Sequence, residues 1–210
     1  MRFVGITQRV QDNESYIERR DCLDQRWATF LNKIDIIPIP IPNLIENPSY
    51  IFKKIKVDGL ILTGGNDIFS ESDSNKGTPE RDILESRLLR YAEDLEIPVI
   101  GVCRGFQFIN NYFGGDIYEI NNHVSTNHNL KTLSDYKNIF PKLVNSYHNN
   151  GIRESDLASP LETLAWSPDD FVEAARHRSL PWLGIMWHPE RQNVAQREDL
   201  DIFSNHFGSI

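Results

Sequence analysis

Apolar and amphipathic stretches alternate along this chain. Short apolar runs with the length of buried strands occupy residues 3–7, 59–62 and 97–102. Apolar residues recur at helical spacing in four segments, at 17–33, 80–95, 106–113 and 199–206. This alternation of strands and helices predicts an α/β fold, with an open, mostly parallel sheet covered by helices on both faces.

The rest of the pattern is less regular. Pro38 and Pro40 interrupt the apolar segment 34–41, which is therefore predicted to be an edge strand or an extended connection. A short helix is expected at 50–56 and a polar, mobile loop at 69–78. Further short strands are expected around residue 143 and at 163–166, 172–176 and 183–187. We expect a single domain over residues 1–210.

The formal net charge of the 210 residues is −8, which argues against nucleic acid or an anionic membrane as the main partner. The first residues lack the pattern of a signal peptide, and no segment has the roughly 18 apolar residues of a membrane helix. A cytoplasmic protein is therefore expected. Cys22 and Cys103 are too few for a disulfide framework, and Cys22 falls within the predicted helix 17–33.

Cys103 has the setting of a nucleophile. The sequence Gly101-Val102-Cys103-Arg104-Gly105 takes a predicted strand directly into a helix, with the cysteine at the junction. The helix N-terminus and the Arg104 side chain would both stabilise a thiolate, and the Arg104 N–H would face a developing oxyanion. A buried structural cysteine before a helix is the alternative interpretation of this pentapeptide.

His188 and Glu190 follow a second apolar strand. Histidine has a suitable pKa to take a proton from a thiol, and a nearby carboxylate can hold the imidazole in one tautomer. Pro189 fixes the backbone between them. Alone, such a pair is more often a surface pair, but a cysteine turn in the same chain favours a Cys-His-Glu triad.

Gly-Val-Cys-Arg-Gly followed by Gln107, together with Trp-His-Pro-Glu near the end, resembles the class I glutamine amidotransferase-like superfamily. The resemblance covers almost the whole chain, and it implies that superfamily's flavodoxin-like sheet and a triad of Cys103, His188 and Glu190. It also implies that Gly65, in Leu-Thr-Gly-Gly-Asn-Asp, supplies a second oxyanion N–H beside that of Arg104. The Cys-Arg-Gly turn, the 81–85 cluster and the 144–148 segment are most similar to the γ-glutamyl hydrolase branch.

The resemblance further implies a pocket for a γ-glutamyl group. The residues expected to contact the substrate are Gln107, Asn145, Ser146, Tyr147, His148, Glu173, Arg19 and Arg81. A glutamyl head carries an α-amino group and an α-carboxylate, so Glu173 is expected to bind the first. Arg81, Arg104 or Arg153 would bind the second.

Two departures from the γ-glutamyl-γ-aminobutyrate hydrolase pattern bear on the substrate. Asn66 stands where those relatives have proline, and Asn149 stands where they often have a second histidine. The N-terminal segment around Thr7-Gln8-Arg9 instead resembles hydrolases of γ-glutamyl-CDP-amidate, which act in capsule phosphoramidate biosynthesis. Arg9, Arg19 and Arg20 would then be candidates for diphosphate contacts, or else solvated surface charges.

No cofactor is implied by this chemistry. His123 and His128 are interpreted as loop histidines rather than metal ligands, because no carboxylate or cysteine accompanies them at ligand spacing. The expected reaction is hydrolysis of a γ-glutamyl amide, a small-molecule substrate, through a thioester. The alternatives are γ-glutamyl-γ-aminobutyrate as substrate, a glutaminase subunit serving a synthetase partner, a catalytically silent binding module, and an α-peptidase. The sequence leaves the oligomeric state open.

Overall fold

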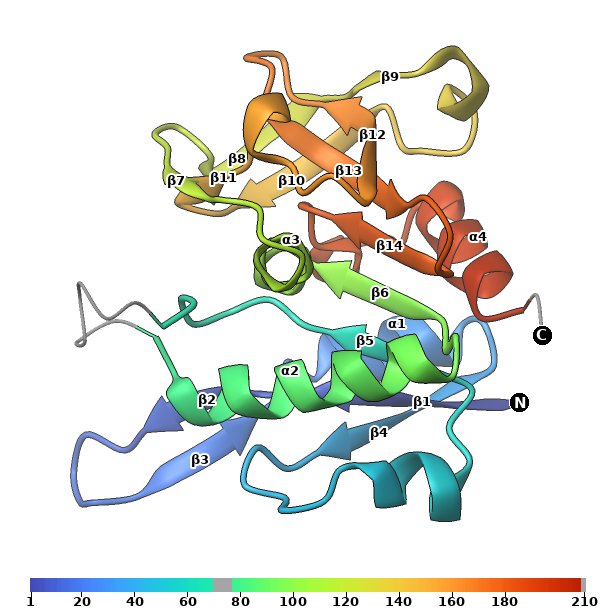
Figure 1. Ribbon diagram of the computed structural model, residues 1–210. Coiled ribbons are helices and arrows are strands. Elements are labelled where there is room, and N and C mark those ends of the chain that lie inside the picture. Colours follow the sequence, from blue (N-terminus) through green and yellow to red (C-terminus); the bar gives the residue numbers. More distant parts are fainter. Residues whose placement is uncertain (70–76, 209–210) are drawn as a thin grey trace.

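A computed structural model describes residues 1–69 and 77–208, and a twisted eight-stranded sheet lies at its centre (Figure 1). The strands run in the order β4-β1-β5-β6-β14-β13-β12-β9. Their bounds are β1 (Arg2–Thr7), β4 (Ile36–Ile41), β5 (Gly59–Leu62), β6 (Val99–Val102), β9 (Lys131–Thr132), β12 (Leu161–Trp166), β13 (Val172–His177) and β14 (Trp182–Ile185). From β4 to β14 each strand is parallel to its neighbour, and from β14 to β9 each strand is antiparallel to its neighbour. This confirms the predicted mostly parallel α/β sheet.

Helices cover both faces of the sheet, as the alternating pattern predicted. On one face, α2 (Pro79–Asp94) and α3 (Arg104–Tyr112) bury Leu84, Leu88 and Phe106. On the other, α1 (Arg26–Asn32) and α4 (Arg197–His206) pack residues such as Trp27 and Phe203 against the opposite sides of the same strands. Four shorter helical turns are η1 (Ile51–Ile55), η2 (Ser134–Tyr136), η3 (Glu154–Asp156) and η4 (Pro189–Arg191).

In the described part of the chain, three small ribbons lie outside the main sheet. They pair β8 (Val124–Asn129) with β10 (Leu143–Tyr147), β7 (Tyr118–Glu119) with β11 (Asn150–Gly151), and β2 (Arg9–Asp12) with β3 (Arg19–Cys22). The strand with Pro38 and Pro40 forms an edge of the main sheet, as expected. None of the helices described here is long and apolar enough to cross a membrane.

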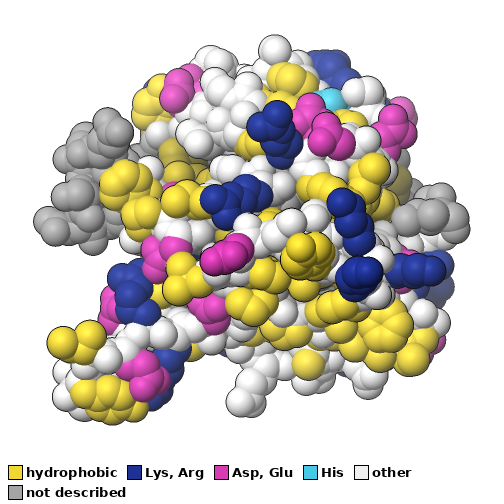
Figure 2. Space-filling view, turned by 60° about the horizontal axis from the view of Figure 1, so that its bottom comes forward, with side chains coloured by type: hydrophobic (Ala, Val, Ile, Leu, Met, Phe, Trp, Pro, Cys, Tyr) yellow, Lys and Arg dark blue, Asp and Glu magenta, His cyan; other side chains and the backbone are white. Residues whose placement is uncertain are grey.

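The predicted helix at 17–33 is wrong in its first half. Residues Arg19–Cys22 form β3 and pair with β2, so Cys22 lies in a strand. The helix begins at Arg26, whose N–H donates to the Asp24 carboxylate at 3.0 Å. Figure 2 shows this hairpin standing away from the body at the lower left, with basic, acidic and hydrophobic side chains close together. Of the predicted loop at 69–78, residues 70–76 lie outside the described part of the chain.

Candidate active site

Cys103 lies at the junction between β6 and α3. Its φ of +53° and ψ of −109° belong to a region that non-glycine residues rarely adopt, as expected for a nucleophile on a sharp turn. The turn is fixed at both ends, because the Cys103 N–H donates to the Ile185 carbonyl at 2.7 Å and its carbonyl accepts from Gln107 at 3.0 Å. A Cβ on Gly105 would lie 2.1 Å from the Leu62 oxygen, so only glycine lets α3 start this close to β5.

His188 reaches Cys103 because β14 and β6 are parallel neighbours and both residues follow the carboxyl ends of these strands. The imidazole lies close enough to Cys103 to act on the pKa of its thiol, and its Nδ1–H donates to Glu190 Oε1 at 2.8 Å. Asn145 holds the His188 backbone through two hydrogen bonds of 2.8 Å, one to its N–H and one to its carbonyl. The structure therefore brings the three predicted triad residues together, and all three are buried.

The Cys103–His188 pair is polarised towards thiolate and imidazolium. Burial raises the pKa of the Cys103 thiol, but the charge and hydrogen bond of His188, with the Arg104 N–H, outweigh it and lower the pKa overall. Burial also lowers the pKa of His188, but the charges of Glu190 and Cys103 dominate and raise it to about 9. An ion pair is the form from which a cysteine attacks most readily.

The turn after β5 faces the same thiol. A Cβ on Gly64 would lie 2.5 Å from His188 Cε1 and 3.4 Å from Cys103 Cβ, so this glycine contacts both catalytic candidates. Arg81 in α2 binds the other side of the turn, donating to the carbonyls of Thr63 at 2.6 Å and Gly64 at 3.3 Å, and to that of Gly65. A trans peptide points its N–H away from its C=O. Because the Gly64 carbonyl points to Arg81, the Gly65 N–H points to the opposite side.

Two predicted roles of arginine side chains are therefore wrong. Arg81 is completely buried beneath the turn and cannot contact a substrate in the groove. The Arg104 guanidinium forms ion pairs with Glu85 and Asp82. Its positive charge is therefore neutralised by these carboxylates and does not stabilise the thiolate or bind a substrate carboxylate. Only the backbone N–H of Arg104 acts on Cys103. Glu85 also binds Arg81, at 2.9 Å, so the network links α2 to α3.

The predicted pocket residues separate into three groups. Gln107 and Tyr147 stay close to the triad: Gln107 lies one helical turn after Cys103, and the Tyr147 ring lies 5.8 Å from that of His188. Asn145 and Ser146 use their side chains within the protein, since Ser146 donates to the His123 carbonyl at 2.6 Å. The Gln107 side chain likewise donates to the Asn150 carbonyl at 2.8 Å. His148 and Glu173 are buried together and are 3.6 Å apart.

A narrow groove runs beside the triad. It is lined by Arg9, Cys22, Leu23, Asp24, Trp27, Thr63, Gly64, His188, Glu190 and Arg191. The sequence pattern indicated Arg9 but not Arg191, although Arg191 directly follows the Trp-His-Pro-Glu motif. Arg19 and Arg20 pair with Glu80 and Glu18, and neither lines this groove.

Asn66 explains one departure from the γ-glutamyl-γ-aminobutyrate hydrolase pattern. Its φ is +60°, a value that proline cannot adopt. Its side chain accepts from the Val10 N–H at 2.8 Å and donates to the Val10 carbonyl at 2.9 Å. Asn66 thereby ties the β2–β3 hairpin to the turn after β5 and sets Arg9 against Gly65.

The spacing argument against a metal is wrong in one respect. The fold brings His148 and Glu173 to His123 and His128, and one ligand atom from each lies within 4.8 Å of the others. The carboxylate that the local sequence lacked comes from β13, far along the chain.

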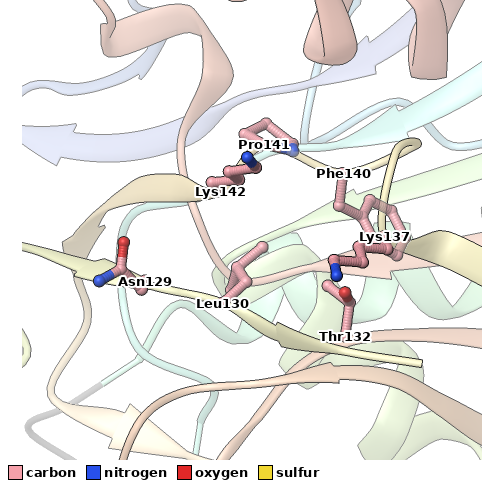
Figure 3. Close-up of a pocket in the computed structure, with 7 residues that line it drawn as sticks. All are labelled: Asn129, Leu130, Thr132, Lys137, Phe140, Pro141 and Lys142. Atoms are coloured by element: carbon pink, nitrogen blue, oxygen red, sulfur yellow. The ribbon is translucent and has the colours of Figure 1, made fainter. Parts of the chain in front are cut away.

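A larger hollow of about 430 Å³ lies away from the triad (Figure 3). Residues 129–142 supply its lining, which includes Phe140, Lys137 and Lys142. It contains no residue of the triad or of the turns that face the thiol.

Comparisons with known proteins bear on the family and the fold. The chain is 33% identical over 194 residues to the γ-glutamyl-CDP-amidate hydrolase of Campylobacter jejuni, covering 91% of each protein. It is 27% identical to the γ-glutamyl-γ-aminobutyrate hydrolase of Escherichia coli O157:H7, covering 80% of this chain and 78% of that one. The crystal structure of a glutamine amidotransferase from Thermotoga maritima matches with a TM-score of 0.63 and 17% identity. It covers 98% of this chain and 84% of that chain and supports the fold.

The family match and the relatives confirm the resemblance to the class I glutamine amidotransferase-like superfamily, and the fold agrees with it. Within it, the chain belongs to the Peptidase C26 family, whose model matches residues 2–190. The family match and the relatives confirm that the protein is a hydrolase enzyme.

Proposed function

We propose that this protein hydrolyses the γ-amide C–N bond of a γ-glutamyl compound with Cys103 as nucleophile, His188 as acid and base, and Glu190 as the residue that orients His188. One observation carries the proposal. Cys103 lies beside a histidine whose Nδ1 is 2.8 Å from the buried Glu190 carboxylate, and the turn at Gly64 contacts both Cys103 and His188.

In the first step, the Cys103 thiolate attacks the γ-carbonyl carbon. The N–H groups of Gly65 and Arg104 bind the resulting oxyanion. His188 then transfers its Nε2 proton to the leaving nitrogen, the C–N bond breaks, and a γ-glutamyl thioester remains on Cys103.

In the second step, water replaces the leaving group. His188, now neutral, takes a proton from water, and the hydroxide attacks the thioester carbon. Collapse of this second oxyanion breaks the C–S bond, releases glutamate and restores the thiolate–imidazolium pair. Gln107 and Tyr147 are the proposed contacts of the glutamyl group, because both lie next to the triad.

We propose an anionic leaving group, with γ-glutamyl-CDP-amidate as the preferred substrate. Arg9 and Arg191 line the groove beside His188. Within the described residues, no hydrogen bond or ion pair occupies the Arg9 guanidinium. The Arg191 Nε makes no hydrogen bond but lies 3.5 Å from Glu190 Oε1, and the Arg191 guanidinium lies 4.8 Å from the centre of the Tyr147 ring. Asp24 in the same groove is already paired with Arg26 at 2.9 Å. Two guanidinium groups suit the oxygens of a diphosphate, and the Campylobacter jejuni relative acts on this compound.

The test is glutamate release, followed by mass spectrometry, from glutamine, γ-glutamyl-γ-aminobutyrate and γ-glutamyl-CDP-amidate. We expect kcat/KM to be highest for γ-glutamyl-CDP-amidate and no release by Cys103→Ala. Equal activity of Cys103→Ala and wild type would contradict the mechanism. Release from glutamine alone, and only with a synthetase present, would instead favour the glutaminase alternative.

The leaving-group assignment has its own test. Loss of one charged contact costs about 1.5–3 kcal/mol. Arg9→Gln and Arg191→Gln should therefore each lower the ratio of kcat/KM for γ-glutamyl-CDP-amidate to that for glutamine by about ten-fold or more. Arg20→Gln is the matched control, because Arg20 pairs with Glu18 on the exposed hairpin. If this ratio of kcat/KM values is unchanged in both Arg9→Gln and Arg191→Gln, the diphosphate does not bind in this groove.

A further inference from the structure

Three buried side chains and one partly buried histidine converge between the β8–β10 ribbon and β13. His123 precedes β8, His128 lies in β8, His148 follows β10, and Glu173 lies in β13 of the main sheet. Figure 1 shows the β8–β10 ribbon beside β13 in the upper part of the molecule. His123, His148 and Glu173 are at most 4% exposed, and the His128 side chain is 10% exposed.

The spacing of these groups suits a tetrahedral metal ion. The Nε2 atoms of His128 and His148 lie 3.4 and 3.6 Å from Glu173 Oε1. Zinc with ligands at about 2.0–2.1 Å in a tetrahedron sets neighbouring ligand atoms about 3.3–3.5 Å apart. The His123 ring centre lies 4.9 Å from that of His148 and 5.5 Å from that of His128, which completes the convergence.

Each imidazole is held from its other side. His148 Nδ1–H donates to the Asn150 carbonyl at 2.9 Å, and His128 Nδ1 lies 3.4 Å from the Asn129 carbonyl. His123 Nε2–H donates to Asp169 Oδ2 at 3.0 Å. Metal-bound histidines characteristically donate their second N–H to a carbonyl or carboxylate, which fixes the tautomer that leaves the ligating nitrogen bare.

The atoms that face one another lack other partners. His123 Nδ1, His128 Nε2, His148 Nε2 and both Glu173 oxygens are buried without a hydrogen bond. The Nε2 atoms of His128 and His148 are within ion-pair distance of Glu173 Oε1, but none of the five atoms has a hydrogen bond. Buried polar atoms are normally hydrogen-bonded, and one ion bound by all four side chains would satisfy them together. We propose that His123, His128, His148 and Glu173 bind a divalent transition-metal ion of the Zn²⁺ type, which imidazole and carboxylate ligands accept.

The ion would join the β8–β10 ribbon to the main sheet. His123 and His128 come from one side of this junction and Glu173 from the other. His148 directly follows Tyr147, and β10 also carries Asn145, which holds His188. The metal is therefore a structural support of the wall beside the triad, and none of the proposed chemical steps uses it.

The test is metal content of protein prepared without a polyhistidine tag, loaded with Zn²⁺ and dialysed. We expect about one Zn²⁺ per chain in wild type, strong loss in His128→Gln and Glu173→Gln, and a lower Tm after chelation. Co²⁺ in place of Zn²⁺ should give the visible absorption of a tetrahedral site, a readout independent of the variants.

Two controls separate this site from other metal binders. His177→Gln, an equivalent change near the end of β13, should retain the ion, since His177 lies outside the cluster. Cys103→Ala should also retain it. Loss of the metal in Cys103→Ala would assign the ion to the nucleophile and overturn the proposal. Zn²⁺ in wild type no higher than in His128→Gln would overturn it as well, and would leave the cluster as histidines paired with Glu173.

Discussion

At the scale of single residues, backbone strain and electrostatics act on the same side chain. The left-handed φ of Cys103 costs about 1–3 kcal/mol, which the contacts of the turn with β14 and α3 offset. This strained conformation places the Cys103 thiol beside His188 and at the N-terminus of α3. Glu190 keeps the imidazole charged, which favours the thiolate.

The pH dependence should reflect this pair. The ion pair needs Cys103 deprotonated and His188 protonated, so kcat/KM should rise as Cys103 loses its proton and fall as pH increases through about 9, the pKa of His188. Glu190→Gln removes a charge that raises this pKa, so the alkaline limb should move to lower pH. The same change should lower kcat roughly 10²- to 10⁴-fold. Initial rates across a pH series measure both effects, and an unmoved alkaline limb would contradict the assigned role of Glu190.

At the scale of elements, the site depends on side chains that never reach the substrate. Arg81 projects from α2 and holds three successive carbonyls of the turn after β5, so the Gly65 N–H points away from Arg81. Asn66 in the same turn ties down β2. The turn is therefore fixed from α2 on one side and from the hairpin on the other.

Arg81→Lys tests this support. Lysine keeps the charge but cannot bind three carbonyls with one planar group. We expect kcat to fall roughly 10²- to 10³-fold, the effect of losing one oxyanion donor, with a much smaller change in KM. Arg87→Lys on the exposed side of α2 is the control. A kcat for Arg81→Lys equal to that of the control, in folded protein, would mean that Arg81 does not orient the turn.

The sequence was most informative where local pattern decides structure. The helix at 80–95 and the strand before Cys103 follow directly from apolar spacing. The β2–β3 hairpin was missed because Arg19–Cys22 is polar and exposed, so its pairing leaves little hydrophobic pattern. Arg81 was assigned to the substrate because a sequence does not show which side of an element a charge faces. The histidine cluster depends on contacts between distant strands, which residue spacing does not encode.

At the scale of the whole molecule, buried charges connect the sheet with two helices. Glu85 in α2 binds Arg81, Arg104 in α3 and the Thr7 hydroxyl at the end of β1. Burial raises the pKa of Glu85, but Arg104 and Arg81 lower it more, so its pKa lies below its usual value. A complete network of this kind tolerates the loss of a partner poorly, because a charge is then left buried and unpaired.

Glu85→Gln should lower the free energy of unfolding by about 3–5 kcal/mol near neutral pH. Because the folded pKa of Glu85 lies below its unfolded value, its contribution is complete above the unfolded pKa of about 4.3 and is lost as pH falls through the folded value. The difference between variant and wild type should therefore shrink in acid. Urea unfolding at several pH values measures this. Glu80→Gln, which removes a more exposed ion pair with Arg19 from the same helix, should cost less than about 1 kcal/mol.

Formation of a γ-glutamyl thioester on Cys103 is the step on which the whole mechanism depends. It can be observed by acid-quenching the enzyme during turnover of γ-glutamyl-CDP-amidate and measuring the intact mass of the protein. We expect an adduct of one glutamyl group on wild type, located on the peptide that contains Cys103, and none on Cys103→Ala. Turnover by Cys103→Ala at the wild-type rate, or an adduct on another residue, would show that Cys103 is not the nucleophile.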